Sequence, residues 1–257
     1  MTASVYDRDG FFASYQKLRS NSNSVNEVIE KPTMLALLAD LQGKRVLDLG
    51  CGCGGHMQLY LRRGAEYVAG VDLSVRMLQE AERILAAERQ SQKLAEKRPH
   101  FSLYHLSMEH LEQLPESGFD VITSSFAMHY IRDFPALLAQ IRDRLTANGI
   151  LIFSQEHPIT TCHKEGERWE KGANKEQRAY RLQHYREEGE RDRNWFNQPF
   201  KTYHRTTATI INRLLDAGFM LERIEEPMLA QQPEWHQEFK DLQHRPPLLF
   251  VKARKTT

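Results

Sequence analysis

A glycine-rich stretch, Val46-Leu-Asp-Leu-Gly-Cys-Gly-Cys-Gly-Gly55, joins an apolar segment to an amphipathic one. Residues 45–49 predict a buried strand, and residues 54–63 predict a helix that ends at Gly64. Glycine lets the chain turn tightly and lets its backbone approach a ligand, while the free N–H groups of the following helix face that ligand. The stretch therefore predicts a ligand-binding turn between the first strand and the first helix of an α/β fold.

Downstream of this turn, short apolar runs alternate with longer amphipathic runs, which is typical of strands and helices in a parallel sheet. The later predicted strands cover residues 67–71, 101–106, 119–124, 150–154, 219–225 and 248–252. The later predicted helices cover residues 74–98, 134–145, 206–217 and, as a short polar helix, about 234–243. We therefore expect an α/β fold with a doubly wound, seven-stranded and mostly parallel sheet.

Composition divides the chain into four parts. We predict an N-terminal arm and helix in residues 1–43, a ligand-binding core in 44–155, an insertion in 156–203, and a helix with closing strands in 204–257. The insertion is crowded with Lys, Arg, Glu, Gln and His and has few aliphatic residues, so its pattern does not predict sheet. Insertions of this length inside a compact domain are commonly functional, and we expect a lid that covers or borders the site.

The balance of acidic and basic residues excludes a partner that binds through the net charge of the whole protein. The 257 residues contain 35 Lys+Arg and 34 Asp+Glu, for a formal net charge of +1, which is too small to gather nucleic acid or anionic lipid. Three cysteines are too few for a disulfide framework, and no stretch approaches the roughly 20 apolar residues of a membrane span. We expect a cytoplasmic protein with no membrane partner, and nucleic acid is disfavoured.

Two ligand classes fit the glycine turn. The spacing Gly50-x-Gly52-x-x-Gly55, with Asp72 located 72 − 50 = 22 residues after the first glycine, matches a dinucleotide-binding fingerprint. Asp48 separates the two classes, because a carboxylate beside the turn would repel a pyrophosphate but would suit the methionyl ammonium of S-adenosylmethionine. The residues therefore favour S-adenosylmethionine, and a dehydrogenase that binds a nicotinamide dinucleotide is the alternative.

The pair Cys51-x-Cys53 invites a metal or redox interpretation. Zinc sites need about four ligands, with paired cysteines two to four residues apart, and this chain has no second pair. We predict no metal site, and we interpret the two thiols as small side chains that fit beside the ligand.

These motifs resemble those of the class I S-adenosylmethionine-dependent methyltransferases. The resemblance is sharpest in Val46 to Gly55, Val71 to Met77 and Phe119 to Tyr130. Three further segments resemble a bacterial group of small type 11/25-like methyltransferases with an internal cap: Ser154-Gln-Glu-His-Pro158, Tyr203-His-Arg205 and His244-Arg-Pro246. The resemblance implies a Rossmann-like fold, S-adenosyl-L-methionine as the cofactor and S-adenosyl-L-homocysteine as the product.

The resemblance also implies which residues surround the methionine part of the cofactor. Gly50, Cys51 and Gly52 would lie along this part, and Asp48 would lie near its ammonium group. After the fourth strand, Ser125 and Phe126 would border the sulfonium region. The segment Tyr15-Gln-Lys-Leu-Arg19 resembles an arm over the cofactor, in which the tyrosine and the arginine would meet the carboxylate; ordinary packing of Tyr15 is an equal alternative.

On the adenosine side, the residues implied by the resemblance are Asp72, Leu73, Met77 and Met108. Asp72 would hold both ribose hydroxyls, and Leu73 and Met108 would lie on either side of the adenine. Many family members offer an Asp to the adenine amino group after the third strand, where this chain has Ser107-Met-Glu109. The polar adenine contact is therefore open between Ser107 and Glu109.

Methyl transfer from a sulfonium mainly requires alignment of the acceptor and exclusion of water, and a base is optional. Histidine is the natural base at neutral pH. Our candidates are His129 and His157, which follow the fourth and fifth predicted strands, and His204. Each of the three also has a structural interpretation, as a cap or a packed side chain.

The sequence leaves the acceptor open between a small molecule and RNA. The insertion mixes basic residues with Trp169, Tyr180, Tyr185 and Trp195, which is a pattern that RNA-binding segments use. Its acidic residues neutralise most of that charge, so we favour a solvated lid and a small-molecule acceptor. No Asn/Asp-Pro-Pro-aromatic motif follows the fourth strand, which disfavours methylation of a nucleobase amino group. A protein that binds the cofactor without catalysis is the third alternative.

Overall fold

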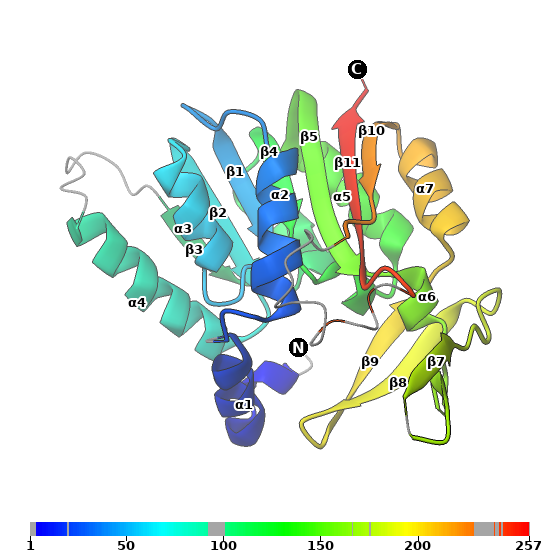
Figure 1. The fold of residues 1–257 in the computed structure, drawn as a ribbon. Helices are drawn as coiled ribbons and strands as arrows, with labels where there is room; N and C mark the ends of the chain where they lie inside the picture. The colour runs from blue at the N-terminus through cyan, green and yellow to red at the C-terminus, as the bar shows by residue number, and fades with distance from the viewer. Residues whose placement is uncertain are drawn as a thin grey trace.

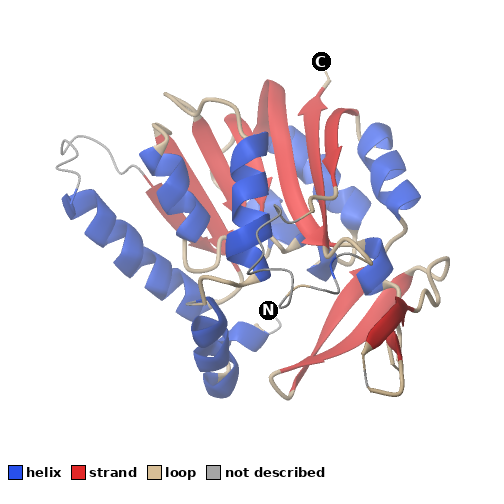
Figure 2. Cartoon of the chain, viewed as in Figure 1, coloured by secondary structure: helices blue, strands red, loops and turns tan. Residues whose placement is uncertain are grey.

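A seven-stranded sheet forms the centre of the molecule, and helices cover both of its faces (Figures 1 and 2). The structure is a computed structural model that describes residues 4–19, 21–91, 101–165, 167–174, 176–228, 239, 242 and 244–256. The strand order is β10-β11-β5-β4-β1-β2-β3, and β11 runs in the opposite direction to the other six strands. The predicted fold class is thereby confirmed.

The strands of this sheet follow the apolar runs of the sequence. Their bounds are β1 Arg45–Leu49, β2 Tyr67–Asp72, β3 Phe101–His105, β4 Phe119–Ser124, β5 Leu145–Glu156, β10 Phe219–Glu225 and β11 Leu248–Lys255. Two strands are longer than predicted by more than one residue: β5 includes the residues before Gly149, and β11 continues for three residues past Lys252. The added end of β11 pairs with β5, since Arg254 lies opposite Ile150, whereas the added Leu145 of β5 lies opposite Phe119 of β4.

The helices have the bounds α1 Asp9–Arg19, α2 Lys31–Leu37, α3 Gly55–Arg62, α4 Val75–Ser91, α5 Phe134–Arg144, α6 Pro158–Thr161 and α7 Thr207–Asp216. The predicted helices at residues 54–63, 74–98, 134–145 and 206–217 correspond to α3, α4, α5 and α7, whereas α6 was not predicted. Shorter helical turns are η1 Val5–Asp7, η2 Asn26–Glu30, η3 Met108–Gln113 and η4 Met128–Tyr130. The predicted end of the helix after Ser74, at residues 92–98, and most of the predicted helix near 234–243 lie outside the described residues.

Side chains that alternate along each strand build a separate core on each face of the sheet. Val46 of β1 packs with residues of α2, α3 and α4, whereas its neighbour Leu47 packs with residues of α5 and α7. Near-continuous apolar runs such as Val121-Ile122 are therefore required, because both faces of a parallel sheet are covered.

The parallel strands end at one edge, which is the lower edge of the sheet in Figure 1. The N-terminal helix α1 and the hairpin β8–β9 both lie at this edge (Figure 1). Ligands of open α/β sheets bind beyond the carboxyl ends of the strands, so this edge is where the functional side chains are sought. No helix in the described parts of the chain is long and apolar enough to cross a membrane.

The insertion contains sheet, and our expectation of a segment without sheet is wrong. It forms the antiparallel hairpins β6 Trp169–Lys171 with β7 Gln177–Tyr180, and β8 Gly189–Trp195 with β9 Gln198–His204. Aliphatic residues are not needed because a hairpin leaves much of its surface in water. Instead, Lys201 pairs across the strands with Glu190 and Asp192, and Phe196 and Asn197 form a tight turn with φ of 50° and 58°.

Candidate functional site

The glycine turn between β1 and α3 has left-handed backbone at Gly50 and Gly52, with φ of 71° and 52°. A Cβ atom on Gly50 would lie 2.8 Å from Ala127 Cβ and 3.0 Å from Met108 Cε. A Cβ atom on Gly52 would meet nothing within 4 Å. Gly50 is therefore needed for close packing beneath the turn, whereas Gly52 borders open space at the carboxyl edge of the sheet.

Asp72, at the end of β2, ties this turn to the helix that follows. Its Oδ2 accepts a hydrogen bond from the Gly52 amide at 2.8 Å, and its Oδ1 accepts one from the Ser74 amide at 2.8 Å. Burial raises the pKa of Asp72, although these two hydrogen bonds oppose the shift. The N-terminal arm reaches the same place, because Asp7 accepts a hydrogen bond from the Ser74 hydroxyl at 2.6 Å.

Asp48 lies deeper, on the face of β1 that α2 and α3 cover. It is 1% exposed, and its Oδ1 accepts a hydrogen bond at 2.9 Å from Thr123, which is its register partner on β4. Burial raises the pKa of Asp48 to about 6; His56 and the Thr123 hydrogen bond oppose the shift, and the carboxylates of Glu30 and Asp72 add to it. A cationic ligand beside Asp48 would favour its ionised form.

The Cys51 side chain is buried, and its part in ligand binding stays a prediction. Its sulfur packs beneath the turn, 2.9 Å from where a Cβ atom on Gly70 of β2 would lie, and burial raises the pKa of the thiol. Cys53 points toward α4, with its Sγ 3.3 Å from the Met77 Sδ. The described residues contain no group of three His, Cys, Asp or Glu side chains that could hold a metal ion.

On the predicted adenosine side, the structure places Leu73 directly after Asp72, and its carbonyl lies 3.0 Å from His105 Nε2. Ser107 caps η3 through a 3.2 Å hydrogen bond from the Glu109 amide. The Glu109 carboxylate accepts hydrogen bonds from the amides of Arg132 and Asp133, at 2.9 and 3.4 Å. Both bonds are to Oε1, so Glu109 orders the segment before α5 through one oxygen of its carboxylate.

Two of the three candidate histidines fasten the insertion. His157 accepts a hydrogen bond from the Ile159 amide at Nδ1, at 3.1 Å, and its Nε2 lies 2.7 Å from Glu226 Oε1. His204 has Nδ1 2.8 Å from the Thr161 hydroxyl and Nε2 2.8 Å from the Tyr185 carbonyl. Both ring nitrogens of each histidine are occupied, so this geometry supports the structural alternative for both.

His129 differs from the other two. It is buried in η4, its ring centroid lies 5.8 Å from that of Phe126, and its Nδ1 accepts a hydrogen bond from the Glu156 amide at 3.4 Å. Burial, assisted by Arg193 and Arg205, lowers the pKa of His129 against the opposing effect of Glu156. A neutral ring that accepts at Nδ1 carries its proton on Nε2, so His129 is arranged to donate a hydrogen bond.

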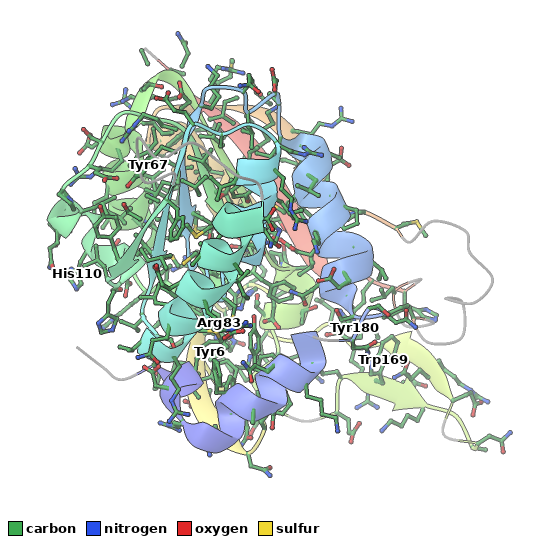
Figure 3. The ribbon with its side chains drawn as sticks, turned by 90° about the vertical axis from the view of Figure 1, so that its left-hand side faces the viewer. Tyr6, Tyr67, Arg83, His110, Trp169 and Tyr180 are labelled. Carbon is green, nitrogen blue, oxygen red and sulfur yellow. The ribbon has the colours of Figure 1, made fainter. Side chains whose placement is uncertain are left out.

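An aromatic cluster joins the N-terminal arm to the insertion, and sequence analysis missed most of it. The Tyr6 ring lies 4.9 Å from Phe11 and 5.1 Å from Tyr15, and its hydroxyl lies 3.2 Å from that of Tyr130. The Trp195 ring, at the tip of the β8–β9 hairpin, lies 5.5 Å from Phe11 and 6.2 Å from Tyr15. Figure 3 shows Tyr6 beside the N-terminal helix at this edge.

The cluster brings together three segments that local sequence patterns do not connect: the arm, η4 and the hairpin tip. Tyr15 belongs to it, which fits the packing alternative for this residue, while the side chain of Arg19 lies outside the described residues. The aromatic side chains on the predicted arm were the sequence signal that could have indicated this cluster, because such rings need a partner surface.

The sequence matches the model of a known protein family. A family model described as "Methyltransferase domain" matches residues 22–221, which is 200 of 257 residues. The chain belongs to this methyltransferase family. The family predicted from the motifs is thereby confirmed. A Haemophilus influenzae protein of uncharacterised function is 68% identical over 98% of this chain and 97% of its own length.

Solved methyltransferase structures match nearly the whole chain. A Listeria monocytogenes protein assigned as an S-adenosylmethionine-dependent methyltransferase is 30% identical, with a TM-score of 0.75 over 89% of this chain and 98% of its own. An S-adenosylmethionine-dependent methyltransferase from Mesorhizobium loti is 28% identical, with a TM-score of 0.75 over 91% and 99%.

Curated relatives with named substrates match only part of the methyltransferase. A ubiquinone biosynthesis O-methyltransferase from Neisseria meningitidis is 32% identical over 49% of this chain and 50% of its own length. A tRNA U34 carboxymethyltransferase from Shewanella woodyi is 34% identical over 46% and 33%. The chain thus spans half or less of the length of these relatives, and their acceptors differ from one another.

Proposed function

We propose that this methyltransferase transfers the methyl group of S-adenosylmethionine to a small-molecule acceptor at the carboxyl edge of its sheet. The chain is an S-adenosylmethionine-dependent methyltransferase by its family and by its neighbours of similar length. The observation that carries the site is the link from the Gly52 amide to Asp72 beside open space. Cys51, Cys53 and Cys162, which all lie in the described part of the chain, form no disulfide, which fits the proposed cytoplasmic location.

The residues of this edge fit the cofactor in shape and charge. Gly52 leaves room where a side chain would stand, and Asp72 offers a carboxylate for the ribose hydroxyls. Asp48 adds a second carboxylate, which is buried and suits the ammonium group. A carboxylate at this place does not suit a pyrophosphate, so Asp48 supports S-adenosylmethionine over a dinucleotide.

When bound, S-adenosylmethionine supplies a methyl group that is activated by the positive charge on its sulfur. The task of the chain is then to place the acceptor in line and to keep water out. We assign the first task to His129, whose Nε2–H would donate a hydrogen bond to the acceptor, and the second to the cluster of Tyr6, Phe11 and Trp195. In this proposal residues 156–203 act as the lid.

An RNA acceptor is the second candidate because of the tRNA relatives, but the charges of the insertion argue against it. Lys164 pairs with Glu187 at 2.5 Å, Lys171 with Glu167 at 3.0 Å, and Arg178 with Glu176 at 2.7 Å. Cations that are already paired with carboxylates attract phosphate groups less strongly. We therefore favour a small molecule.

Incubation of the protein with S-adenosylmethionine labelled in its methyl group and a protein-free cell extract tests the acceptor class. We expect the label in a small-molecule product, at the same level with and without ribonuclease treatment of the extract. A charge-reversed variant with Arg178→Glu, Arg181→Glu and Arg186→Glu should transfer the label to the small molecule as the wild-type protein does. Label found only in RNA, and lost in the charge-reversed variant, would replace the small-molecule proposal with the RNA alternative. Cofactor binding without transfer to any fraction would support the non-catalytic alternative.

Cofactor binding is expected to release a proton from Asp48 near pH 6. The carboxyl of the free protein has a pKa of about 6, and a cation beside it lowers the pKa, so affinity should rise as pH increases through this value. Calorimetry at pH 6 in two buffers of different ionisation enthalpy measures the released proton. Asp48→Asn should abolish the release and flatten the pH dependence. Equal binding heats in both buffers for the wild-type protein would contradict the placement of a cationic group beside Asp48.

A further inference from the structure

A buried carboxylate from the N-terminal part of the chain enters the site from the α2 face. Glu30, the last residue of η2, is fully buried, and its Oε1 accepts hydrogen bonds from the hydroxyls of Ser125 at 2.6 Å and Ser154 at 2.8 Å. Its Oε2 lies 3.4 Å from Nε2 of His56 on α3. One side chain thereby connects η2, α3 and the ends of β4 and β5.

The two serines control the backbone after β4. The Phe126 amide donates to the Ser154 hydroxyl at 2.9 Å and to the Ser154 carbonyl at 3.1 Å. Phe126 has a φ of 57°, which is an unfavourable left-handed conformation for a bulky residue. The surrounding hydrogen bonds must therefore hold this conformation, and Glu30 orients the hydroxyl that accepts one of them.

Glu30 is held in its ionised form. Burial alone would raise its pKa, but the nearby His56 and the hydrogen bonds from His56, Ser125 and Ser154 outweigh burial and lower it. A buried charge is costly unless it is paired. An apolar side chain would fill the same position at lower cost if the position were only a packing site.

We infer that Glu30 is a positioning residue for cofactor binding, which holds the Ser125–Phe126 backbone through the two serine hydroxyls. The inference rests on the proposed function and on the predicted place of Ser125 and Phe126, which the family resemblance puts beside the sulfonium region of S-adenosylmethionine. It also gives η2 and α2 a role in the site, because a shift of this segment would move Glu30 away from both serines.

The test measures S-adenosylmethionine affinity by calorimetry, which needs no acceptor. Glu30→Ala is expected to weaken binding about tenfold or more, because both hydroxyls lose their acceptor. Glu30→Gln should restore part of this loss, since an amide oxygen can accept both hydrogen bonds. Ser154→Ala should weaken binding in the wild type but change it less than twofold in Glu30→Ala, because the two residues act in one chain of contacts.

Glu88 provides a matched control at the far end of α4. It is also a buried glutamate, with both oxygens 2.7 Å from the Arg62 guanidinium and one 2.8 Å from Gln58. Glu88→Ala should lower the unfolding temperature and change the cofactor affinity by less than twofold. A general loss of stability is thereby separated from loss of positioning.

An affinity of Glu30→Ala within twofold of the wild type would overturn this inference and leave the proposed function intact. If Glu30→Ala does not fold, Ser125→Ala and Ser154→Ala decide the matter: wild-type affinity in both overturns the inference, and weakened binding in both supports it. Failure of the wild-type protein to bind S-adenosylmethionine would overturn the proposed function as well, so the two failures are distinguishable.

Discussion

Asp72→Ala is expected to weaken S-adenosylmethionine binding by roughly 100-fold or more, or about 2.7 kcal/mol. In the proposed site the carboxylate would accept charge-assisted hydrogen bonds from two ribose hydroxyls, and each such bond contributes more than a neutral one. The substitution also removes the acceptor of the Gly52 and Ser74 amides, so the turn itself loses its anchor. Calorimetric titration with the cofactor measures the loss directly.

Asp120→Ala is the matched control for Asp72→Ala. Asp120 lies near the beginning of β4, at the opposite edge of the sheet, where its Oδ2 accepts a hydrogen bond from the Arg45 amide at 2.9 Å. We expect this variant to bind the cofactor as the wild type does. An unchanged affinity in Asp72→Ala would remove our site assignment, and tight binding of a nicotinamide dinucleotide by the wild-type protein would favour the dehydrogenase alternative.

Gly52→Ala is expected to lower cofactor affinity roughly 30-fold, about 2 kcal/mol, while the protein remains folded. The added methyl group meets no protein atom within 4 Å, so folding suffers only the left-handed strain of about 1 kcal/mol. The same methyl group would stand in the open space that we assign to the cofactor. Calorimetry and thermal unfolding separate these two effects.

Gly43→Ala controls for the backbone strain. Gly43 has a φ of 69° and also open space around its would-be Cβ atom, but it lies before β1 at the other edge of the sheet. Both variants should therefore lose similar stability, and only Gly52→Ala should lose affinity. If both retain wild-type affinity, the cofactor does not approach the Gly52 backbone as proposed.

Local sequence patterns predicted the parts of the fold and site that depend on neighbouring residues. The first strand, the glycine turn and the Ser74 cap were predictable because apolar runs and capping residues act over a few positions. The place of Asp72 beside the glycine turn was predictable because parallel strands end at the same edge, so the tip of β2 must lie beside the turn after β1.

The same patterns could not decide which candidate histidine keeps a ring nitrogen for an acceptor. His129 and His157 follow predicted strands, and His204 lies just before a predicted helix. They differ in their hydrogen-bond partners, which are the Glu156 amide, the distant Glu226 carboxylate and the Thr161 hydroxyl. Strand pairing in the insertion was also hidden, because its strands carry charged cross-strand pairs such as Lys201 with Asp192 rather than aliphatic residues.

The amino-acid sequence alone was sufficient to predict the central sheet, the glycine turn and the family, because backbone conformation and apolar periodicity are local properties. Only the tertiary structure showed that Glu30 accepts hydrogen bonds from Ser125 and Ser154, which lie 95 and 124 residues away in the sequence. It also showed that the hydroxyls of Tyr6 and Tyr130 form a hydrogen bond. Such contacts depend on the relative placement of packed segments. A buried carboxylate can be recognised as part of a site only when the groups that stabilise its charge are seen around it.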